Sequence, residues 1–456
     1  MKRRFTGATM MMVAWMTISS TMAQAPQTPI LDSYLKIGLE NNLVLKQKNI
    51  TLEQAMYSLK IANGMFAPSL SLLGNYLNGT GGRSISFPVG DLLNPVYSTL
   101  NQLTGSNQFP QIPNVNTNFL PQDFYDVRAR ASMPLLNTDL IYNRKIKDRQ
   151  VLLQEIEVQI YQRELIRNIK VAYFNYLSAL EGISIYQSAL TRAQEGKRVS
   201  ESLLANGKSL PAYVLRSQSE IETIRAQLTD AERQADNGKI YFNFLLNRKP
   251  DEAIDSEYIP ELTHITKILA QESSASQREE LQKLKTAQEL NQQVVDMNKL
   301  FWTPRISGFL DIGAQAENLE YNDNSRYTLL GFQMEVPLFA GFNNRHKVTN
   351  SQLELRNTDL SLQNLNQQLN MSTQVSKNSL ISSYQNYLSA RQQLEAAQSY
   401  QRLIEKGYKE GLNSFIETID ARNQLTSAEL SVRLNLYRVL AAEANLERET
   451  ASYPLN

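Results

Sequence analysis

VRARASMPLLNTDLIYNR, the stretch from Val127 to Arg144, changes its periodicity in the middle. Up to Met133 apolar and polar residues alternate, which predicts a strand because successive side chains of a strand point to opposite faces. After Pro134 the alternation stops, Asn137 offers an N-cap, and apolar residues then recur every three or four positions, which predicts a helix. The chain therefore passes from a strand directly into a long helix.

The same passage occurs again in the second half of the chain. The stretch LGFQMEVPLFAGFNNR, from Leu330 to Arg345, alternates up to Val336 and then repeats a proline, a leucine, an asparagine and an arginine of the first stretch. A short motif, NYLSA, also occurs twice, at Asn175–Ala179 and Asn386–Ala390. The sequence therefore predicts an internal duplication.

Three more alternating segments predict strands at Ser69–Asn78, Arg305–Gln315 and Thr328–Val336. With the first strand this gives four amphipathic strands of about ten residues, the length at which a tilted strand crosses a bilayer. Aromatic residues near the strand ends match the girdles of transmembrane β-barrels; they are Phe66, Tyr76, Trp302 and Tyr327.

Four strands cannot close such a barrel. The smallest barrels have about eight strands, so two chains are the minimum, and three chains would supply about twelve. The alternative is a soluble four-stranded sheet that packs on helices. Two features weigh against it: no helix of the chain is apolar enough to cover the apolar face, and the polar face carries charges that suit a wet lumen, namely Arg128, Arg130, Asp311 and Glu335.

The longest helix is predicted over Asn137–Asn206, a run without proline. About 70 residues at about 1.5 Å per residue make a helix on the order of 105 Å long. The turn Gly207–Pro211 leads into a helix that returns to about Leu246, and the second half repeats this order with a helix over Asn344–Lys409 and a turn at Gly411. A four-three heptad spacing marks the seam of the first long helix, formed by Leu165, Ile169, Ala172, Tyr176, Ala179, Ile183, Tyr186 and Leu190.

A further helix is predicted over residues 29–64. Together with the helix after the first turn, it matches the length of the uninterrupted helix. We therefore expect these two helices to stack end to end beside it. The polar run Ser361–Gln374 then faces water, or lines a channel if the helices close into a cylinder.

Composition limits the class of protein. The net charge is +1, which argues against a nucleic-acid partner. The chain has no cysteine, so disulfides and thiol chemistry are excluded. Lys2, Arg3 and Arg4 precede an apolar run and small residues, which predicts a signal peptide cleaved after Ala23 and an exported chain. No later segment reaches about 18 uninterrupted apolar residues, so no spanning helix is predicted.

Catalytic motifs are absent from the sequence. The two histidines, His264 and His346, are far apart and are expected to be surface or linker residues rather than metal ligands. No Gly-x-Ser-x-Gly elbow occurs. We therefore expect no enzyme, no cofactor and no metal. Residues from Gly79 to Tyr125 are rich in Gly, Pro, Asn and Ser without a period, which predicts a long loop.

The strand ends FAPSLSLLGNY and FWTPRISGFLDIG and the corners PLLNTDLIYNR and PLFAGFNNR occur in the same order in the two halves. In this ordered set the sequence resembles the TolC-like outer membrane efflux proteins, and the resemblance covers essentially the whole mature chain. It implies a mixed α and β membrane protein, in which three chains share a twelve-stranded barrel of four strands each. A long periplasmic α-helical barrel of coiled-coil helices is expected to continue it.

The expected domains follow this plan. They are a signal peptide (1–23), a periplasmic helix (24–66), two barrel strands with a long extracellular loop (67–136), a periplasmic helical hairpin (137–248), a linker or equatorial segment (249–276), a second periplasmic helix (277–300), two further barrel strands (301–338), and a second periplasmic hairpin with the C-terminal tail (339–456).

The resemblance also implies a periplasmic gate at the second turn. Two acidic residues of the family fall on Glu417 and Asp420, which share a helix face and would form a ring of carboxylates in a trimer. The alternative is two solvated charges in the first turn of a helix, where the helix dipole favours them. The turn glycines, Gly207 and Gly411, are expected to act as hinges.

The gate tyrosine of the family falls on Tyr408. Asn413 stands where the family protein has a gate arginine, and Tyr213 where it has an aspartate. A different latch is therefore expected, formed by Tyr408 with Tyr213 or Arg216.

The function predicted from these features is a passive exit duct in the outer membrane of a Gram-negative bacterium. It is expected to form a homotrimer in outer-membrane lipid, to extend into the periplasm, and to serve a tripartite efflux or type I secretion system. Its expected partners are a periplasmic adaptor protein and an inner-membrane pump of the resistance-nodulation-division or ABC type.

A coiled-coil scaffold without a pore, in the periplasm or at the cell surface, is the alternative. The sequence leaves open the cargo and the identity of the adaptor. The long loop from Gly79 to Phe124 is open to several readings as well, namely a phage or antibody surface, a pore constriction or tolerated length; we favour a loop folded over the outer mouth.

Overall fold

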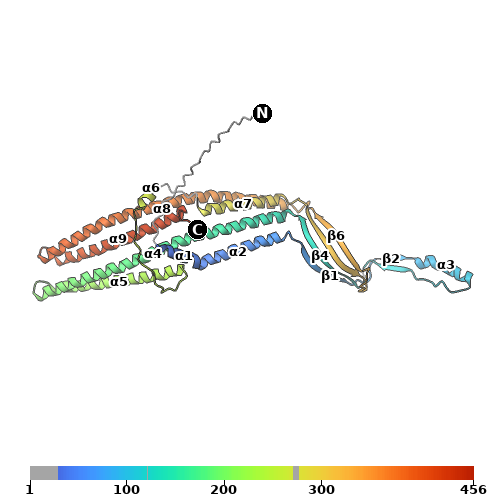
Figure 1. Ribbon diagram of the computed structural model, residues 1–456, viewed down its shortest axis with the longest axis horizontal. Coiled ribbons are helices and arrows are strands. Elements are labelled where there is room, and N and C mark those ends of the chain that lie inside the picture. Colours follow the sequence, from blue (N-terminus) through green and yellow to red (C-terminus); the bar gives the residue numbers. More distant parts are fainter. Residues whose placement is uncertain (1–28, 121, 271–276, 456) are drawn as a thin grey trace, which may run out of the picture. The chain divides into compact units, whose positions relative to one another are not determined.

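The computed structural model describes residues 29–120, 122–270 and 277–455. The predicted signal peptide and residues 271–276 of the predicted linker lie outside this part. In chain order (Figure 1) the elements are α1 (Pro29–Asn41), α2 (Leu43–Gly64), β1 (Ser69–Leu77), β2 (Ser84–Phe87), α3 (Val89–Thr104), β3 (Val115–Asn118), β4 (Phe124–Leu136), α4 (Thr138–Ala205), α5 (Pro211–Leu245), α6 (Ile265–Ala270), α7 (Glu279–Lys299), β5 (Arg305–Ala316), β6 (Arg326–Glu335), α8 (Asn343–Lys409) and α9 (Phe415–Thr450).

These elements divide into two compact units. The helical unit contains the described residues up to Leu52, Leu153–Thr286 and those from Asp359 onward, and the strand unit contains Glu53–Leu152 and Ala287–Thr358. The protein is mostly helical, with a small antiparallel sheet. Within the described ranges, no helix combines the length and the hydropathy needed to cross a bilayer.

The periodic segments form the elements that they predict, with ends within three residues of those expected. At the strand-to-helix passage, Asn137 is the residue before α4, and its side-chain oxygen accepts hydrogen bonds from the N–H groups of Asp139 (3.0 Å) and Leu140 (3.3 Å). This is N-cap geometry, which supplies acceptors for the first unpaired N–H groups of a helix.

The helix predicted over residues 29–64 is interrupted at Asn42. The Asn42 amide donates to the carbonyl oxygen of Leu245 at 2.9 Å, and its oxygen accepts from the N–H of Leu45 at 3.0 Å. A short side chain that bonds to nearby backbone groups competes with regular helix, and here it also joins the break to the end of α5. The lengths agree with end-to-end stacking, since α1, α2 and α5 have 13, 22 and 35 residues and α4 has 68.

The segment predicted as an irregular loop, Gly79–Tyr125, contains regular structure, so that prediction is wrong in part. β2 and β3 pair with each other as an antiparallel ribbon, and α3 lies between them. Pro95 and several asparagines masked the helical period in the sequence. The asparagines bond instead to the chain that follows the helix, through Asn94 and Asn101.

The four long strands form one antiparallel sheet in the order β1-β4-β5-β6. Leu70 pairs with Ala131, Ala131 with Leu310, and Leu310 with Leu330, so these residues form one row on one face. This apolar face is bare: the exposed fraction is 79% for Leu70, 70% for Leu330 and 73% for Phe332. Among the described residues, no helix packs on this face of the sheet.

The opposite face of the sheet is polar and internally bonded. Arg130 on β4 forms two hydrogen bonds with the carboxylate of Asp311 on β5, at 2.7 and 2.6 Å, while its guanidinium lies 4.7 Å from the ring centre of Phe309. Beside this pair, Arg128 contacts Asp126. Arg128 lies opposite Gly313, where a Cβ would approach its Cβ to 2.6 Å, so only glycine leaves room.

The core of the helical unit is built around Tyr173 of α4. Its ring lies 5.8 Å from that of Tyr34 and 5.6 Å from that of Phe242, and its hydroxyl donates to the carbonyl of Asp255 at 2.8 Å. Burial raises the pKa of Tyr173. These contacts join α1, α4, α5 and the segment after α5, and the first half of the predicted heptad seam, from Leu165 to Tyr176, is buried here.

A second group of buried charges joins α4, the start of α7 and the end of α9. Glu280 accepts from Arg278 at 2.8 Å and from Arg448 at 2.6 Å; Arg448 also reaches Glu164 at 3.3 Å, and Arg278 contacts Glu449. Burial alone would raise the pKa of Glu280, but the two guanidinium groups outweigh it and lower the pKa from 4.5 to about 2.

The predicted linker contains a short helix, α6, and is attached to α9 by His264. The Nε2 atom of His264 lies 2.6 Å from a carboxylate oxygen of Glu443, and only 12% of the histidine side chain is exposed. His264 is therefore a linker residue, as expected, but it is not on the surface. His346 is exposed.

This attachment should depend on pH. The hydrogen bond with Glu443 raises the pKa of His264 above 6.5, although burial opposes the shift, and Glu261 adds to it. The stabilisation is complete below about 6.5 and is lost as the pH rises through the raised pKa. We expect the amides of residues 262–268 to exchange about threefold faster at pH 8.5 than at pH 6, after correction for intrinsic rates, and His264→Gln to remove this difference. Equal protection at both pH values in the parent would contradict the prediction.

Candidate functional site

The candidate site lies in the helical unit, at the two turns that end the helical hairpins. Gly207 after α4 has φ +68° and Gly411 after α8 has φ +76°. The next residue donates back in the same way in both turns, Lys208 to the carbonyl of Leu203 at 2.8 Å and Leu412 to that of Gly407 at 2.7 Å. This is the Schellman ending of a helix, which needs a residue in the left-handed region. Both predicted hinge glycines lie at turn ends, and their role in opening stays a prediction.

Each turn presents an apolar side chain that the sequence analysis did not single out. Leu210 is 58% exposed and Leu412 is 82% exposed. Each lies between the turn glycine and the next helix. A leucine at that position is therefore the feature of the sequence from which this exposed side chain could have been predicted.

Glu417 has a structural role in addition to its predicted one. It is the third residue of α9 and forms a capping box with Ser414: its carboxylate accepts from the Ser414 N–H at 2.6 Å, and its own N–H donates to the Ser414 hydroxyl at 3.3 Å. The hydrogen bond from the Ser414 backbone lowers the pKa of Glu417, and Asn413 contributes by donating to the same carboxylate at 3.2 Å. Serine three residues before glutamate is a readable sign of this motif.

Asp420 lies one turn further along α9. It accepts from Gln424 at 2.9 Å, and both it and Glu417 are exposed. The two carboxylates therefore share the solvent side of the first turns of α9, as their spacing predicts.

An aromatic cluster joins the two hairpins. Phe415, buried at the start of α9, stacks on Tyr213 of α5 with ring centres 4.9 Å apart, and Tyr408 of α8 lies 6.1 Å from the same ring. Burial raises the pKa of Tyr408. In the described part of the chain no hydrogen bond joins Tyr408 to Tyr213 or to Arg216, and Arg216 is exposed. The latch named from the sequence stays a prediction.

A buried ion pair that the sequence analysis missed also joins the two hairpins. Arg422 of α9 donates to both carboxylate oxygens of Glu220 of α5, at 3.2 and 2.8 Å, and the two side chains are only 7% and 4% exposed. Gly196 of α4 leaves room for the pair, since a Cβ there would lie 3.0 Å from the guanidinium carbon. Further along the same helices, Arg192 of α4 binds Glu429 of α9 at 2.8 Å.

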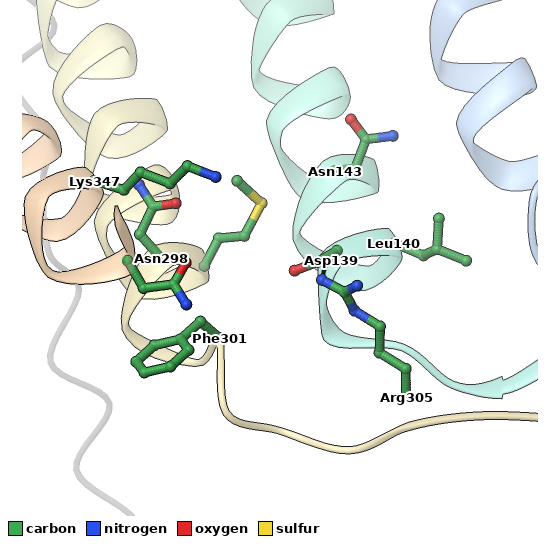
Figure 2. A pocket seen from close by; sticks show the side chains of 9 residues that line it. Asp139, Leu140, Asn143, Asn298, Phe301, Arg305 and Lys347 are labelled. Carbon is green, nitrogen blue, oxygen red and sulfur yellow. Dashed lines mark hydrogen bonds and ion pairs between the residues drawn. The ribbon is translucent and has the colours of Figure 1, made fainter. Parts of the chain in front are cut away.

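A cavity of about 410 Å³ lies in the strand unit, where α7 ends and α4 and α8 begin. Figure 2 shows Asp139 and Arg305 pointing toward one another, with Lys347 entering from α8. Asp139 and Arg305 form an ion pair at 2.5 Å. The lining combines charges of both signs and amides with the apolar side chains of Leu140, Met297 and Phe301, so the cavity is of mixed polar and apolar character. Across the described residues, no three acidic, histidine or cysteine side chains gather as a metal site requires.

Comparison with known proteins gives a consistent result. The family model for outer membrane efflux proteins matches residues 35–247 and 271–451. The chain is similar to the solved outer-membrane channel OprN (16% identity, 93% of this chain and 91% of that chain, TM-score 0.76) and to VceC of Vibrio cholerae (13%, 92% and 95%, 0.75). It is also similar to the open state of the MtrE channel of Neisseria gonorrhoeae (16%, 92% and 89%, 0.72). No curated protein sequence matches.

At this identity the likeness to solved structures is one of fold, and the family model supplies the rest. It confirms the prediction of an outer-membrane exit duct of efflux systems that extends into the periplasm, and it identifies a family of channels rather than enzymes. The match covers most of the chain, in both halves, and therefore the chain belongs to the outer membrane efflux protein family.

Proposed function

We propose that three copies of this chain assemble into a duct in which their sheets close one twelve-stranded barrel and their hairpins form a tunnel through the periplasm. The duct does no chemistry and lets cargo pass that an energised inner-membrane pump delivers. The domain limits predicted from the sequence, including the signal peptide at 1–23, are part of this proposal.

The observation that carries the proposal is the sheet. Its outer strands, β1 and β6, each pair on one side only, and its apolar face is bare over the full width of the row from Leu70 to Leu330. Lipid can cover the apolar face, but it cannot satisfy the backbone groups of the two edges, which therefore require strands from other copies. A scaffold without a pore leaves both features without a purpose.

An internal duplication is supported by the two hairpins. α4 and α5 have 68 and 35 residues, and α8 and α9 have 67 and 36. Both pairs begin after a barrel strand and turn through the same Schellman geometry at Gly207 and Gly411.

The turns are the proposed contact with a periplasmic adaptor. Leu210 and Leu412 present apolar groups at both hairpin ends, which an adaptor can bury. The inner-membrane pump of this proposal is of the resistance-nodulation-division or ABC type.

Opening of the duct requires that the hairpins separate at these ends. The groups that hold them together are the Glu220–Arg422 pair and the cluster of Phe415 with the two tyrosines. We propose that the ion pair is the latch and that the exposed carboxylates of Glu417 and Asp420 form the ring at the entrance.

The test is to extract the protein with detergent, measure the mass of the particle by light scattering, and record its conductance in a planar lipid bilayer. A mass of three chains and stable conductance steps support the duct. Release of the protein by osmotic shock without detergent, together with no steps, would reject it in favour of the scaffold.

The ring predicts a specific effect on ion selectivity. Glu417→Gln with Asp420→Asn keeps the size of both side chains and the capping hydrogen bonds, but removes six charges from a trimer. We expect cation selectivity to fall and block by a trivalent cation to weaken by about tenfold. The control, Glu222→Gln with Asp230→Asn, changes two exposed carboxylates of α5. If both variants behave alike, the carboxylates are only solvated charges.

A further inference from the structure

Residues 84–118, between β1 and β4, form a folded body of β2, α3 and β3 rather than a loose loop. Asn94 of α3 exchanges two hydrogen bonds with the backbone of Ile112, at 3.0 and 2.9 Å, and Asn101, seven residues later, does the same with Phe109, at 2.8 and 3.0 Å. Gly90 allows the chain around Ile112 to lie close to α3, since a Cβ at this position would lie 2.4 Å from the carbonyl oxygen of Ile112. One side of α3 is thus bonded to the chain that follows it.

The other side of α3 is apolar and bare. Leu92 is 70% exposed, Val96 51% and Leu103 78%. With Thr99 these residues follow a four-three-four spacing, the spacing of a helix that packs against other helices. Exposure of three large apolar side chains on a helix that is already held in place indicates a partner.

Charge narrows the choice of partner. Asp91 is the only charged residue between Ser84 and Asn118, and it is bound by Asn114 at 2.9 Å, away from the apolar stripe. Helices that lie on membranes carry lysine or arginine on their polar face, and anionic lipid needs such cations. None is present here. A contact between identical copies around one axis, in contrast, brings any charge close to the same charge of the next copy, where the two repel each other. Such a contact therefore favours an uncharged surface.

Chain connectivity places this body beside the joint between copies. β2 follows directly after β1, a strand with a free edge, and Leu77 pairs with Phe124 at the end of the sheet from which the segment emerges. Figure 1 shows β2 and α3 beyond the ends of β1 and β4. Three such bodies on one barrel are held at a high effective concentration, so a short apolar stripe is sufficient to join them.

We propose that the stripe of Leu92, Val96 and Leu103 packs against the same stripe of the other two copies and forms a three-helix cap over the outer mouth of the duct. The cap rests on the proposed trimer and adds to it a defined contact outside the barrel. It also gives the long first segment a role in narrowing the exit.

The chain has no cysteine, so single cysteines can be introduced as probes. Leu103→Cys places one thiol per copy on the stripe. Gln102→Cys is the matched control, since it is adjacent, exposed and about 100° around the helix. Each detergent-extracted trimer is treated with copper phenanthroline and run on a denaturing gel without reductant.

Leu103→Cys is expected to link close to two thirds of the chains into dimers, because two of three thiols in a threefold cluster can pair, and Gln102→Cys fewer than about one tenth. Adding Leu92→Glu to Leu103→Cys should lower linking about fivefold by placing three carboxylates in the contact.

Equal linking of the two cysteines in particles that have the mass of a trimer overturns the cap and leaves the duct intact. The cap is also overturned if the Leu103→Cys thiol does not form a disulfide and is protected from a maleimide in intact cells but not in the extracted protein. That result would indicate that a different protein covers the stripe. Particles with the mass of one chain reject the duct and the cap together.

Discussion

Glu220→Ala should raise the conductance of the resting duct about tenfold. The substitution leaves the guanidinium of Arg422 buried without its partner, which costs about 3–5 kcal/mol in comparable buried pairs. The cost applies where the two hairpins are together and is relieved where they separate. Since about 1.4 kcal/mol changes a two-state ratio tenfold, a fraction of this cost is enough to populate the open arrangement. Single-channel recording without an adaptor measures the effect.

Two further variants test the cause. Glu222→Ala removes a carboxylate two residues away on α5 that pairs only along its own helix, with Arg225 at 3.0 Å, and should leave the conductance unchanged. Glu220→Leu combined with Arg422→Met removes both charges and should recover most of the thermal stability, because an apolar pair has no buried charge to satisfy. The latch is wrong if Glu220→Ala and Glu222→Ala give the same resting conductance.

Acid should weaken the helical unit through Glu280, with an expected loss of about 3 kcal/mol. The pKa of this carboxyl is lowered in the folded protein from 4.5 to about 2, against the effect of burial, by Arg278 and Arg448. A lowered pKa means that the stabilisation is present above about pH 4.5 and is lost as the pH falls toward 2. Urea denaturation followed by circular dichroism at pH 6 and pH 2.5 measures it.

Glu280→Gln should remove most of this dependence while lowering the stability at pH 6. Glu289→Gln, an exposed position on the same helix with one surface ion pair, should follow the parent at both pH values. If Glu280→Gln loses as much stability between pH 6 and pH 2.5 as the parent does, the acid sensitivity lies in other carboxylates.

The sequence predicted the long elements well because they repeat one period over many residues. A strand of alternating residues and a helix with a heptad seam each provide many independent positions, so isolated exceptions do not hide them. α3 was missed because its polar residues do not face water. Asn94 and Asn101 bond to the backbone of the following segment, whereas asparagine in a sequence is typical of loops. The break at Asn42 was missed for a similar reason, since its partner is the carbonyl of Leu245.

The site could be predicted only where it is local. The turn glycines and the acidic positions of α9 are short-range features, and Ser414 with Glu417 is a motif that the sequence displays. Glu220 and Arg422 are 202 residues apart, and no local rule joins them. Their signal was indirect: each is a charge close to apolar residues at helical spacing, Ile221 and Ile224 in α5 and Ile419 and Leu425 in α9.

The free edges of β1 and β6 have a genetic consequence. In the proposed trimer a copy with one damaged edge breaks one of the three joints of its ring, so the barrel cannot close and the two sound chains beside it are lost as well. If half of the chains in a cell carry such a change, about one eighth of the assemblies are free of it, because composition follows the cube of the sound fraction. Mutations in these two strands should therefore be dominant when the normal gene is also expressed, whereas changes that prevent export of the chain should be recessive.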